Sequence, residues 1–266
     1  MGKVWVNFKH DKSMGTDIPR TVNIANAMYG FRELGAEIVP YHSVPEILDK
    51  VTRDDIVVDG IFQSEAIFKK FNVADPHIPY YPEVLNEFLG RKIWTDKINS
   101  IASDKEKWSV GYFVKPVTEK AFTGKTISSL SDLIGCGNEH EDFDVFVSEP
   151  IDILAEWRCF ILYDRIVDVR LYGGLSGSTY DGFMYHYDSD VLKRILDAFL
   201  SWDERPAACS IDICYTKDGR TLLVECNDAY SLGSYGLNGI FYARMISARW
   251  SQILGREDEY RFISCG

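Results

Sequence analysis

The chain lacks several features that mark large classes of proteins. Its 266 residues contain no run of 18 uncharged apolar residues, so we expect no membrane-spanning helix. The start, Met1 to Phe8, has no basic region followed by a long apolar segment, which favours a cytoplasmic protein without a secretory signal. Neither G-x-G-x-x-G nor G-x-x-x-x-G-K-[ST] occurs, so the two common phosphate-binding loops are absent.

Basic residues are also scarce relative to acidic ones. The chain has 29 Lys and Arg against 40 Asp and Glu, and its net charge is −11. With no Lys/Arg-rich run, this balance argues against a dedicated nucleic-acid binder but allows a local basic pocket for phosphate. The six cysteines are expected to be reduced thiols, because Cys209 and Cys214 lack the further His/Cys pair of a structural zinc site.

The composition that remains is typical of a globular protein. Apolar residues make up 46% and charged residues 26%, which excludes disorder, collagen and coiled coil as the main structure. Alternation and turn signals in the first 60 residues give the order β-α-β-α-β, which predicts a parallel sheet covered by helices. The predicted strands are 3–8, 36–40 and 55–59, and the predicted helices are 20–34 and 45–51.

The rest of the chain predicts a mixed fold in two further parts. Three prolines between residues 75 and 82 indicate a domain edge. The predicted helices are 83–89, 96–103, 128–134, 190–202 and 237–254, and the predicted strands are 110–117, 143–148, 158–162, 166–172, 208–215 and 221–225. We therefore expect an α+β (α/β) protein with domains 1–82, 83–150 and 151–266.

One acidic group of residues suggests a metal site. Glu225 and Asn227 are two apart on a predicted strand and therefore face the same side. Asp212 lies on the preceding strand of the same hairpin, which the Asp218-Gly219 turn predicts. Two carboxylates and an amide oxygen suit Mg²⁺ or Mn²⁺. The alternative is a polar strand end that faces solvent.

A basic group of residues accompanies it. Lys115, Arg158 and Arg170 lie on strands among apolar neighbours, and Lys97 follows Asp96 at a predicted helix start. A buried, unpaired ammonium is costly, and arginine favours bidentate contact with phosphate or carboxylate. Each residue alone is equally compatible with a salt bridge in an acidic protein, but four of them together indicate a phosphate-binding region.

In their order along the chain, these segments resemble the ATP-grasp superfamily over residues 91–240. The segments that carry the resemblance are Thr95-Asp96-Lys97, Phe113-Val114-Lys115, Phe122-Thr123-Gly124-Lys125, Val147-Ser148-Glu149-Pro150-Ile151, Glu156-Trp157-Arg158, Val169-Arg170, Asp212 and Glu225-Cys226-Asn227. The resemblance implies an ATP-grasp fold, preceded by the N-terminal β-α-β pre-ATP-grasp domain. The single glycine of the small loop, Gly124, departs from the glycine-richer pattern of many members.

The resemblance also implies a role for each of these residues. Lys97 and Lys115 would contact the nucleotide phosphates, and Lys125 would be a further donor from the loop. Ser148, Glu149 and Ile151 would form the hinge on which adenine binds, and Glu156 would hold the ribose. The remaining roles are phosphoryl-group neutralisation by Arg158 and Arg170, and ligation of Mg²⁺ or Mn²⁺ by Asp212, Glu225 and Asn227.

The implied function is an ATP-dependent ligase. It would activate a carboxylate as an acyl-phosphate and couple it to an amine of an amino acid, peptide or protein, with ADP and phosphate as products. Tyr230, Ser231, Ser234 and Tyr235, which follow the metal residues, are candidates for substrate contact. Two alternatives are a nucleotide-binding regulatory module without turnover and a hydrolase that uses Glu149 and Glu156 as a carboxylate pair.

Overall fold

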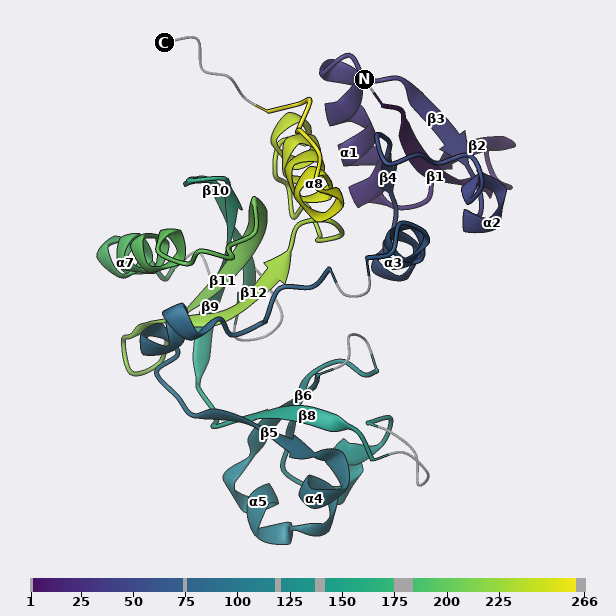
Figure 1. Ribbon diagram of the computed structural model, residues 1–266. Helices are drawn as coiled ribbons and strands as arrows, with labels where there is room; N and C mark the ends of the chain where they lie inside the picture. The colour runs from purple at the N-terminus through teal and green to yellow at the C-terminus, as the bar shows by residue number, and fades with distance from the viewer. Residues whose placement is uncertain (1, 74–75, 118–120, 137–141, 175–183, 262–266) are drawn as a thin grey trace.

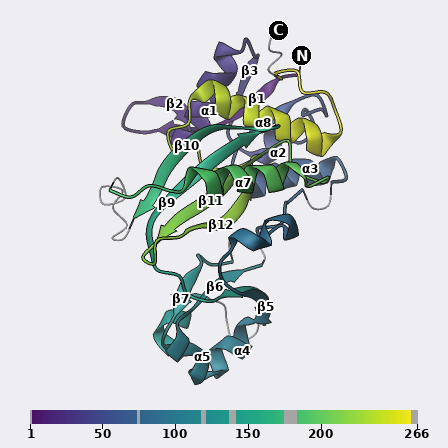
Figure 2. The same ribbon diagram turned by 90° about the vertical axis from the view of Figure 1, so that its left-hand side faces the viewer.

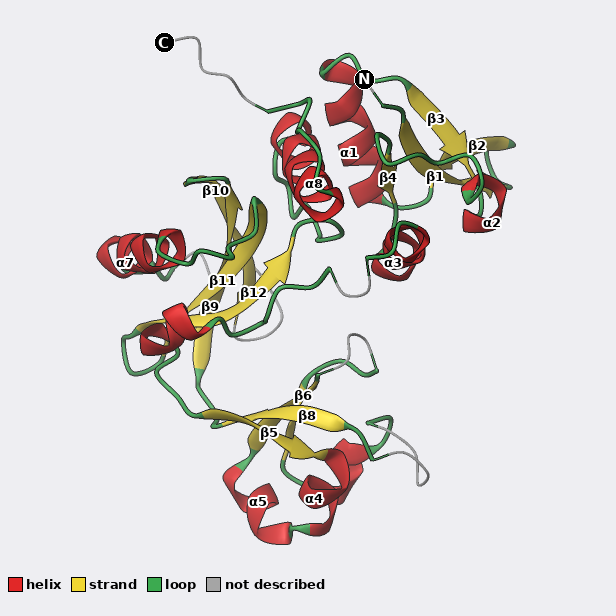
Figure 3. Ribbon diagram, viewed as in Figure 1, coloured by secondary structure: helices red, strands yellow, loops and turns green. Residues whose placement is uncertain are grey.

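The computed structural model describes residues 2–73, 76–117, 121–136, 142–174 and 184–261. Three four-stranded sheets account for its strands. The N-terminal sheet lies at one end of the molecule, the sheet of the C-terminal segment lies in the middle, and a smaller sheet lies at the other end (Figure 1). Helices flank each sheet (Figure 3), so the mixed α and β class predicted from the sequence is confirmed.

The N-terminal sheet has the parallel order predicted from the sequence. β1 (Val4–Asp11) pairs in parallel with both β3 (Ile38–Tyr41) and β4 (Ile56–Val58). β2 (Thr16–Pro19) pairs antiparallel with the end of β1, inside a segment where the sequence predicts a loop. Four residues with a proline at the edge give no recognisable alternation. The helices of this part are α1 (Val22–Glu33), α2 (Val44–Ile47) and α3 (Ile61–Lys70).

The middle sheet is antiparallel throughout, with the order β10-β9-β11-β12. Its two hairpins form at the predicted turns around Asp164 and Asp218. Leu192, Ile195 and Phe199 of the helix that follows β10 are buried in the same apolar core as the sheet. The elements are β9 (Ile153–Leu162), β10 (Arg165–Gly174), α7 (Ser189–Leu200), β11 (Ala208–Thr216) and β12 (Thr221–Asp228).

The small sheet has the order β5-β8-β6-β7 and precedes the middle sheet along the chain. Asp96 and Lys97 belong to its first strand, because they pair with Val145 and Asp144, and the helix predicted from residue 96 therefore begins at Ile98. The elements of this part are β5 (Ile93–Lys97), α4 (Ile98–Ser103), α5 (Lys105–Val110), β6 (Tyr112–Pro116), β7 (Lys125–Ile127) and β8 (Asp144–Ser148), with 3₁₀ turns at Glu83–Phe88 and Leu130–Leu133.

The last helix joins the two ends of the chain. α8 (Gly239–Leu254) lies beside α1, as both views show (Figures 1 and 2), and shares one apolar core with the N-terminal sheet. A Cβ atom at Gly30 would lie 1.8 Å from the carbonyl oxygen of Gly239, so the two backbones approach more closely than any larger residue allows. The division of the chain at residues 82 and 150 stays a prediction.

Candidate active site

Four charged residues form a row across the middle sheet. Arg170 pairs with Arg158, Arg158 with Asp212, and Asp212 with Glu225, so each strand contributes one member. Directly opposed residues of antiparallel strands place their side chains on the same face. The row therefore runs from two positive charges to two negative charges on one side of the sheet. It confirms that Asp212 and Glu225, predicted from a hairpin alone, are neighbours.

The two inner members of the row form a buried ion pair. Arg158 Nε and Nη2 donate to the two carboxylate oxygens of Asp212 at 2.8 and 2.6 Å, and both side chains are excluded from solvent. Burial raises the pKa of Asp212, and the Arg158 guanidinium opposes that shift. The Arg158 Cζ atom lies 4.8 and 4.7 Å from the ring centroids of Tyr172 and Tyr235, so two aromatic rings flank the pair.

Lys115 links the outer acidic residue to the small sheet. Its Nζ atom lies 2.6 Å from Glu225 Oε2 and 3.2 Å from the ring centroid of Tyr80. Lys115 belongs to β6, whereas Glu225 belongs to β12, so this contact joins the small sheet to the middle sheet. The contact matters for function because it brings a cation from one sheet to the acidic residues of the other.

The three predicted metal ligands lie together. Asn227 Nδ2 donates to Asp212 Oδ2 at 3.1 Å and to Glu225 Oε1 at 3.3 Å. In the described part of the chain, no three His, Cys, Asp or Glu side chains are grouped as a metal site. A cation here would therefore depend on two carboxylates and one amide. This oxygen set fits the hard cations Mg²⁺ and Mn²⁺, once Arg158 and Lys115 give up part of their contact with it.

Glu156 is the most strongly perturbed carboxyl group beside the row. It precedes Arg158 by two positions on β9 and is half-buried. Burial, with the charges of Asp212 and Glu225 adding to it, raises the pKa of Glu156 to about 8. At neutral pH this carboxyl group therefore holds its proton in this structure and carries a hydrogen-bond donor.

Three of the predicted residues have partners away from this cluster. Lys97 Nζ lies 3.0 Å from Asp144 Oδ1, and Lys125 Nζ donates to the carbonyl oxygen of Ile134 at 3.0 Å. Arg170, at the exposed end of the row, pairs with Asp168 on its own strand at 2.6 Å. The structure thus brings together Lys115, Glu156, Arg158, Asp212, Glu225 and Asn227, but neither Lys97 nor Lys125.

The predicted hinge connects the small sheet to the middle sheet, and a buried arginine holds it. Arg91 Nε donates to Ser148 Oγ at 2.9 Å, and its Nη atoms donate to the carbonyl oxygens of Leu223 and Val224 on β12 at 2.8 and 3.0 Å. Glu149 accepts from the backbone N–H of Lys92. Burial lowers the pKa of Arg91. The sequence did not reveal Arg91, because an arginine after Gly90 has no apolar pattern around it.

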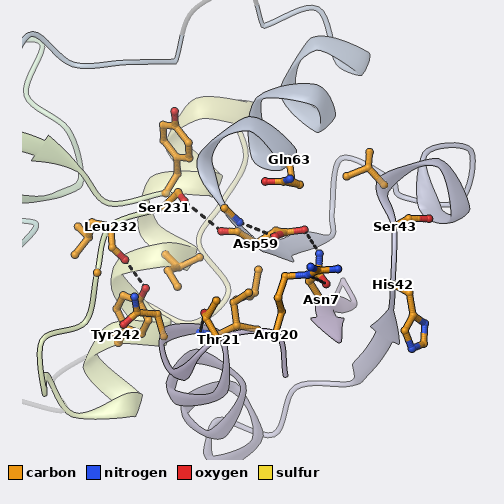
Figure 4. A pocket seen from close by; sticks show the side chains of 18 of the residues that line it. Asn7, Arg20, Thr21, His42, Ser43, Asp59, Gln63, Ser231, Leu232 and Tyr242 are labelled. Atoms are coloured by element: carbon orange, nitrogen blue, oxygen red, sulfur yellow. Dashed lines mark hydrogen bonds between the residues drawn. The ribbon is translucent and has the colours of Figure 1, made fainter. Parts of the chain in front are cut away.

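Two adjoining cavities open beside the cluster. The first, which we call the cleft, has a volume of about 560 Å³ and is lined by Lys115, Gly124, Arg158, Asn227 and Tyr235 among others. The second, which we call the N-terminal cavity, has a volume of about 640 Å³ and is drawn in Figure 4. Both are lined by Asn23, Tyr230, Ser231, Leu232 and Gly233.

The segment after the metal residues forms the wall between these cavities, where the sequence predicted substrate contact. Tyr230 and Ser231 line both cavities, and Tyr235 lines the cleft. Ser234 is buried and binds Asn23 of α1 through its N–H and Oγ, at 3.1 and 2.9 Å. Cys226 faces the core behind the sheet, as its position between Glu225 and Asn227 predicted.

Residues 88–245 match a family model whose description is an ATP-grasp domain, family 2 of its clade. The chain belongs to this ATP-grasp family. ATP and Mg²⁺ or Mn²⁺ are the cofactors of ATP-grasp enzymes, as the sequence resemblance implied. The matched range contains the charged row, the hinge and the first turns of α8, and leaves out the N-terminal sheet.

Solved structures of ATP-grasp ligases share the fold of the whole chain. D-alanine–D-alanine ligase from Bacillus anthracis has a TM-score of 0.55 and 12% identity, covering 96% of this chain and 99% of that chain. In its complex with ATP, the same ligase has a TM-score of 0.54 and 13% identity, covering 96% and 98%. N5-carboxyaminoimidazole ribonucleotide synthetase from Thermotoga maritima has a TM-score of 0.50 and 13% identity, covering 97% and 77%.

Two further findings complete the comparison. No curated protein sequence matched the chain. Within the described residues, no helix is both long and apolar enough to cross a membrane.

Proposed function

We propose that this ATP-grasp protein is an ADP-forming ligase that joins a carboxylate to an amine. The observation that carries the proposal is the meeting of Lys115, Arg158, Asp212, Glu225 and Asn227 where the small sheet faces the middle sheet. Cations and metal-ligating oxygens are both needed to bind and neutralise a nucleotide triphosphate. The segments 83–150 and 151–266 would hold ATP between them, and residues 1–82 would contribute to the substrate side.

The ion pairs of the cluster are suited to exchange when nucleotide binds. Lys115 and Arg158 each hold a carboxylate that can instead ligate a cation. Phosphate oxygens would take over Lys115 and Arg158, and Asp212, Glu225 and Asn227 would hold Mg²⁺ or Mn²⁺. Bound there, the cation would offset phosphate charge. Arg170, at the end of the row, would neutralise the transferred group if it leaves Asp168.

The hinge and its neighbours fit the nucleoside part of ATP. The backbone from Ser148 to Ile151 passes from one sheet to the other, and Arg91 fixes it to β12. Polar backbone groups at this place would bind the adenine edge. Glu156 lies on β9 between the hinge and Arg158, where its carboxyl group would hold the ribose hydroxyls. Lys97 and Lys125 would join the phosphates only if the small sheet moves.

The reaction requires no nucleophile from the protein. A carboxylate oxygen of the substrate bonds to the γ-phosphorus of ATP while the bond to the β–γ bridging oxygen breaks, which releases ADP. The amine then attacks the carbonyl carbon of the acyl-phosphate, loses a proton and expels phosphate. The protein's residues position the groups, neutralise charge and exclude water that would hydrolyse the intermediate. The hydrolase alternative is less favoured, because Glu149 and Glu156 have separate partners.

Turnover of ATP with Mg²⁺ tests the proposal. The full chain is incubated with pools of amino acids and short peptides, and ADP and AMP are quantified separately. We expect ADP and phosphate only with a pool that contains the substrates, and no product in Glu225→Ala. Arg165→Gln, an exposed change in the β9–β10 turn, is the control that should leave turnover unchanged. AMP as the product, or binding of ATP without turnover in every pool, would contradict the proposal.

A further inference from the structure

The N-terminal cavity lies where an open α/β sheet binds its ligand. The chain leaves β1 for β3 at one side and returns to β4 at the other, so the strand order reverses between β1 and β4. In open sheets of this kind, ligands bind beyond the carboxyl ends of the strands at this reversal. Asn7 comes from the end region of β1 and Asp59 directly follows β4, and both line the cavity.

Two opposite charges line this cavity, with one amide between them. Arg20 Nε donates to Asn7 Oδ1 at 2.9 Å, and Asn7 Nδ2 donates to Asp59 Oδ2. Figure 4 shows Asn7 with its amide directed at Asp59 and the Arg20 side chain approaching the same group. Asn7 is buried, so its amide is fixed. Arg20 and Asp59 are therefore close together without neutralising each other.

Asp59 is held as an acceptor. Its carboxylate accepts hydrogen bonds from the Asn7 amide, the Tyr41 hydroxyl and the backbone N–H of Gly60, the last at 2.7 Å. In the described residues, no lysine, arginine or histidine forms an ion pair with it. The Nη groups of Arg20 make no hydrogen bond to a described residue either. A ligand that carries one positive and one negative charge would complete both groups.

The N-terminal cavity also adjoins the reaction site. Ser231 Oγ donates to the backbone carbonyl oxygen of Asp59 at 3.2 Å, and Ser231 lines both cavities. Asp59 therefore lies at the wall shared with the cleft. Arg20 lies on the other side of Asn7 from Asp59. A ligand bound to both would direct its positive end toward the cleft.

We propose that the N-terminal cavity binds a free α-amino acid as the amine substrate. Its ammonium group contacts Asp59 and its carboxylate contacts Arg20. The match in size supports this class, since Arg20 and Asp59 bind opposite sides of one amide and the two charges of an α-amino acid are one carbon apart. The inference rests on the proposed ligase function, because it names the amine of that reaction.

Calorimetric titration of the full chain, saturated with Mg²⁺ and AMPPNP, tests binding without turnover. The probes are the common L-amino acids, their D-enantiomers, and the N-acetyl and carboxamide derivatives of any that bind. We expect one amino acid, or a chemically related group, to bind. N-acetylation and amidation should each weaken that binding at least about tenfold, because each removes one charged contact. These derivatives probe the native protein and do not depend on a variant that folds.

Variants then assign the two contacts. Asp59→Asn should lose affinity for the amino acid but discriminate little against its N-acetyl derivative, and Arg20→Gln should behave in the same way toward the carboxamide. Asp164→Asn and Arg165→Gln, exposed in the β9–β10 turn, serve as matched controls. Equal affinity in Asp59→Asn, Arg20→Gln and wild type would overturn the assignment, as would binding of AMPPNP with no amino acid. Failure to bind AMPPNP or turn over ATP would instead reject the ligase proposal.

Discussion

The cleft and the N-terminal cavity share a wall but hold their charges differently. In the cleft, Arg158 pairs with Asp212 and Lys115 with Glu225, so each cation is matched by a carboxylate. In the N-terminal cavity, the Asn7 amide keeps Arg20 and Asp59 apart. The cleft residues therefore stabilise the fold as well as the proposed chemistry, because loss of one partner leaves a buried charge. The residues of the N-terminal cavity contribute mainly to binding.

The strongest test of this contrast is Asp212→Asn. The change leaves Arg158 buried without a counter-charge, so we expect a loss of about 3–5 kcal/mol in the free energy of unfolding, together with loss of ATP turnover. Urea denaturation measures the first effect. Asp168→Asn is the matched control: it breaks an Arg–Asp pair on the same face where Arg170 is half-exposed, and should cost only about 0–1 kcal/mol. Equal losses in the two variants would contradict the contrast.

The contact between α1 and α8 keeps the two cavities in one body, because α1 carries Asn23, which lines both. Gly30→Ala would place a methyl group against the Gly239 backbone, so we expect a loss of about 1–3 kcal/mol in unfolding free energy. Gly60→Ala is the control for stability, since its added methyl would meet only the flexible end of Gln63. A Gly30→Ala protein as stable as Gly60→Ala would show that the helices separate easily.

The small sheet offers a test among lysines. Lys115→Ala should weaken ATP binding about 10- to 100-fold, because Lys115 reaches the cluster and is largely buried. Lys97→Ala and Lys125→Ala should weaken it less than about fivefold, since these residues have partners elsewhere. Calorimetric titration with AMPPNP and Mg²⁺ measures all three. Equal effects would mean that the small sheet rearranges when nucleotide binds, as the sequence resemblance alone would imply.

Glu156 gives the smallest effect, and its sign depends on pH. Below pH 4.5 the carboxyl group is protonated in both folded and unfolded chains. Between pH 4.5 and about 8 only the folded chain keeps the proton, so the wild type loses stability as pH rises. Glu156→Gln cannot titrate, and we expect it to melt roughly 2–4 °C above the wild type at pH 9, with a smaller difference at pH 5. Thermal melts with EDTA measure this; a difference that does not change with pH would contradict it.

The sequence predicted the parts of this molecule that depend on local signals. The hairpin around Asp218 and the spacing of Glu225 and Asn227 were enough to place three residues on one face beside Asp212. Strand periodicity also predicted the parallel order of the first sheet. These features depend on neighbours within about 15 residues, where turn chemistry and alternation determine the structure.

The features that the sequence missed depend on contacts between distant segments. Arg91 is buried only because β12 passes beside the hinge, more than 130 residues later. Asn7 and Asp59 meet because β1 and β4 are adjacent, and no spacing rule predicts that Asn7 would separate Arg20 from an acid. The short strands β2, β5 and β7 lie at sheet edges, where pairing with a neighbour, rather than their own pattern, makes them strands.

The central claim is that a substrate carboxylate is phosphorylated by ATP at the cleft. The most direct measurement follows ¹⁸O from a carboxylate-labelled substrate pool into inorganic phosphate, with the full chain, ATP, Mg²⁺ and an amino acid that the N-terminal cavity binds. We expect ADP and phosphate that carries one ¹⁸O atom, since the carboxylate oxygen leaves with the phosphate. Phosphate without the label, or AMP with pyrophosphate, would contradict the account.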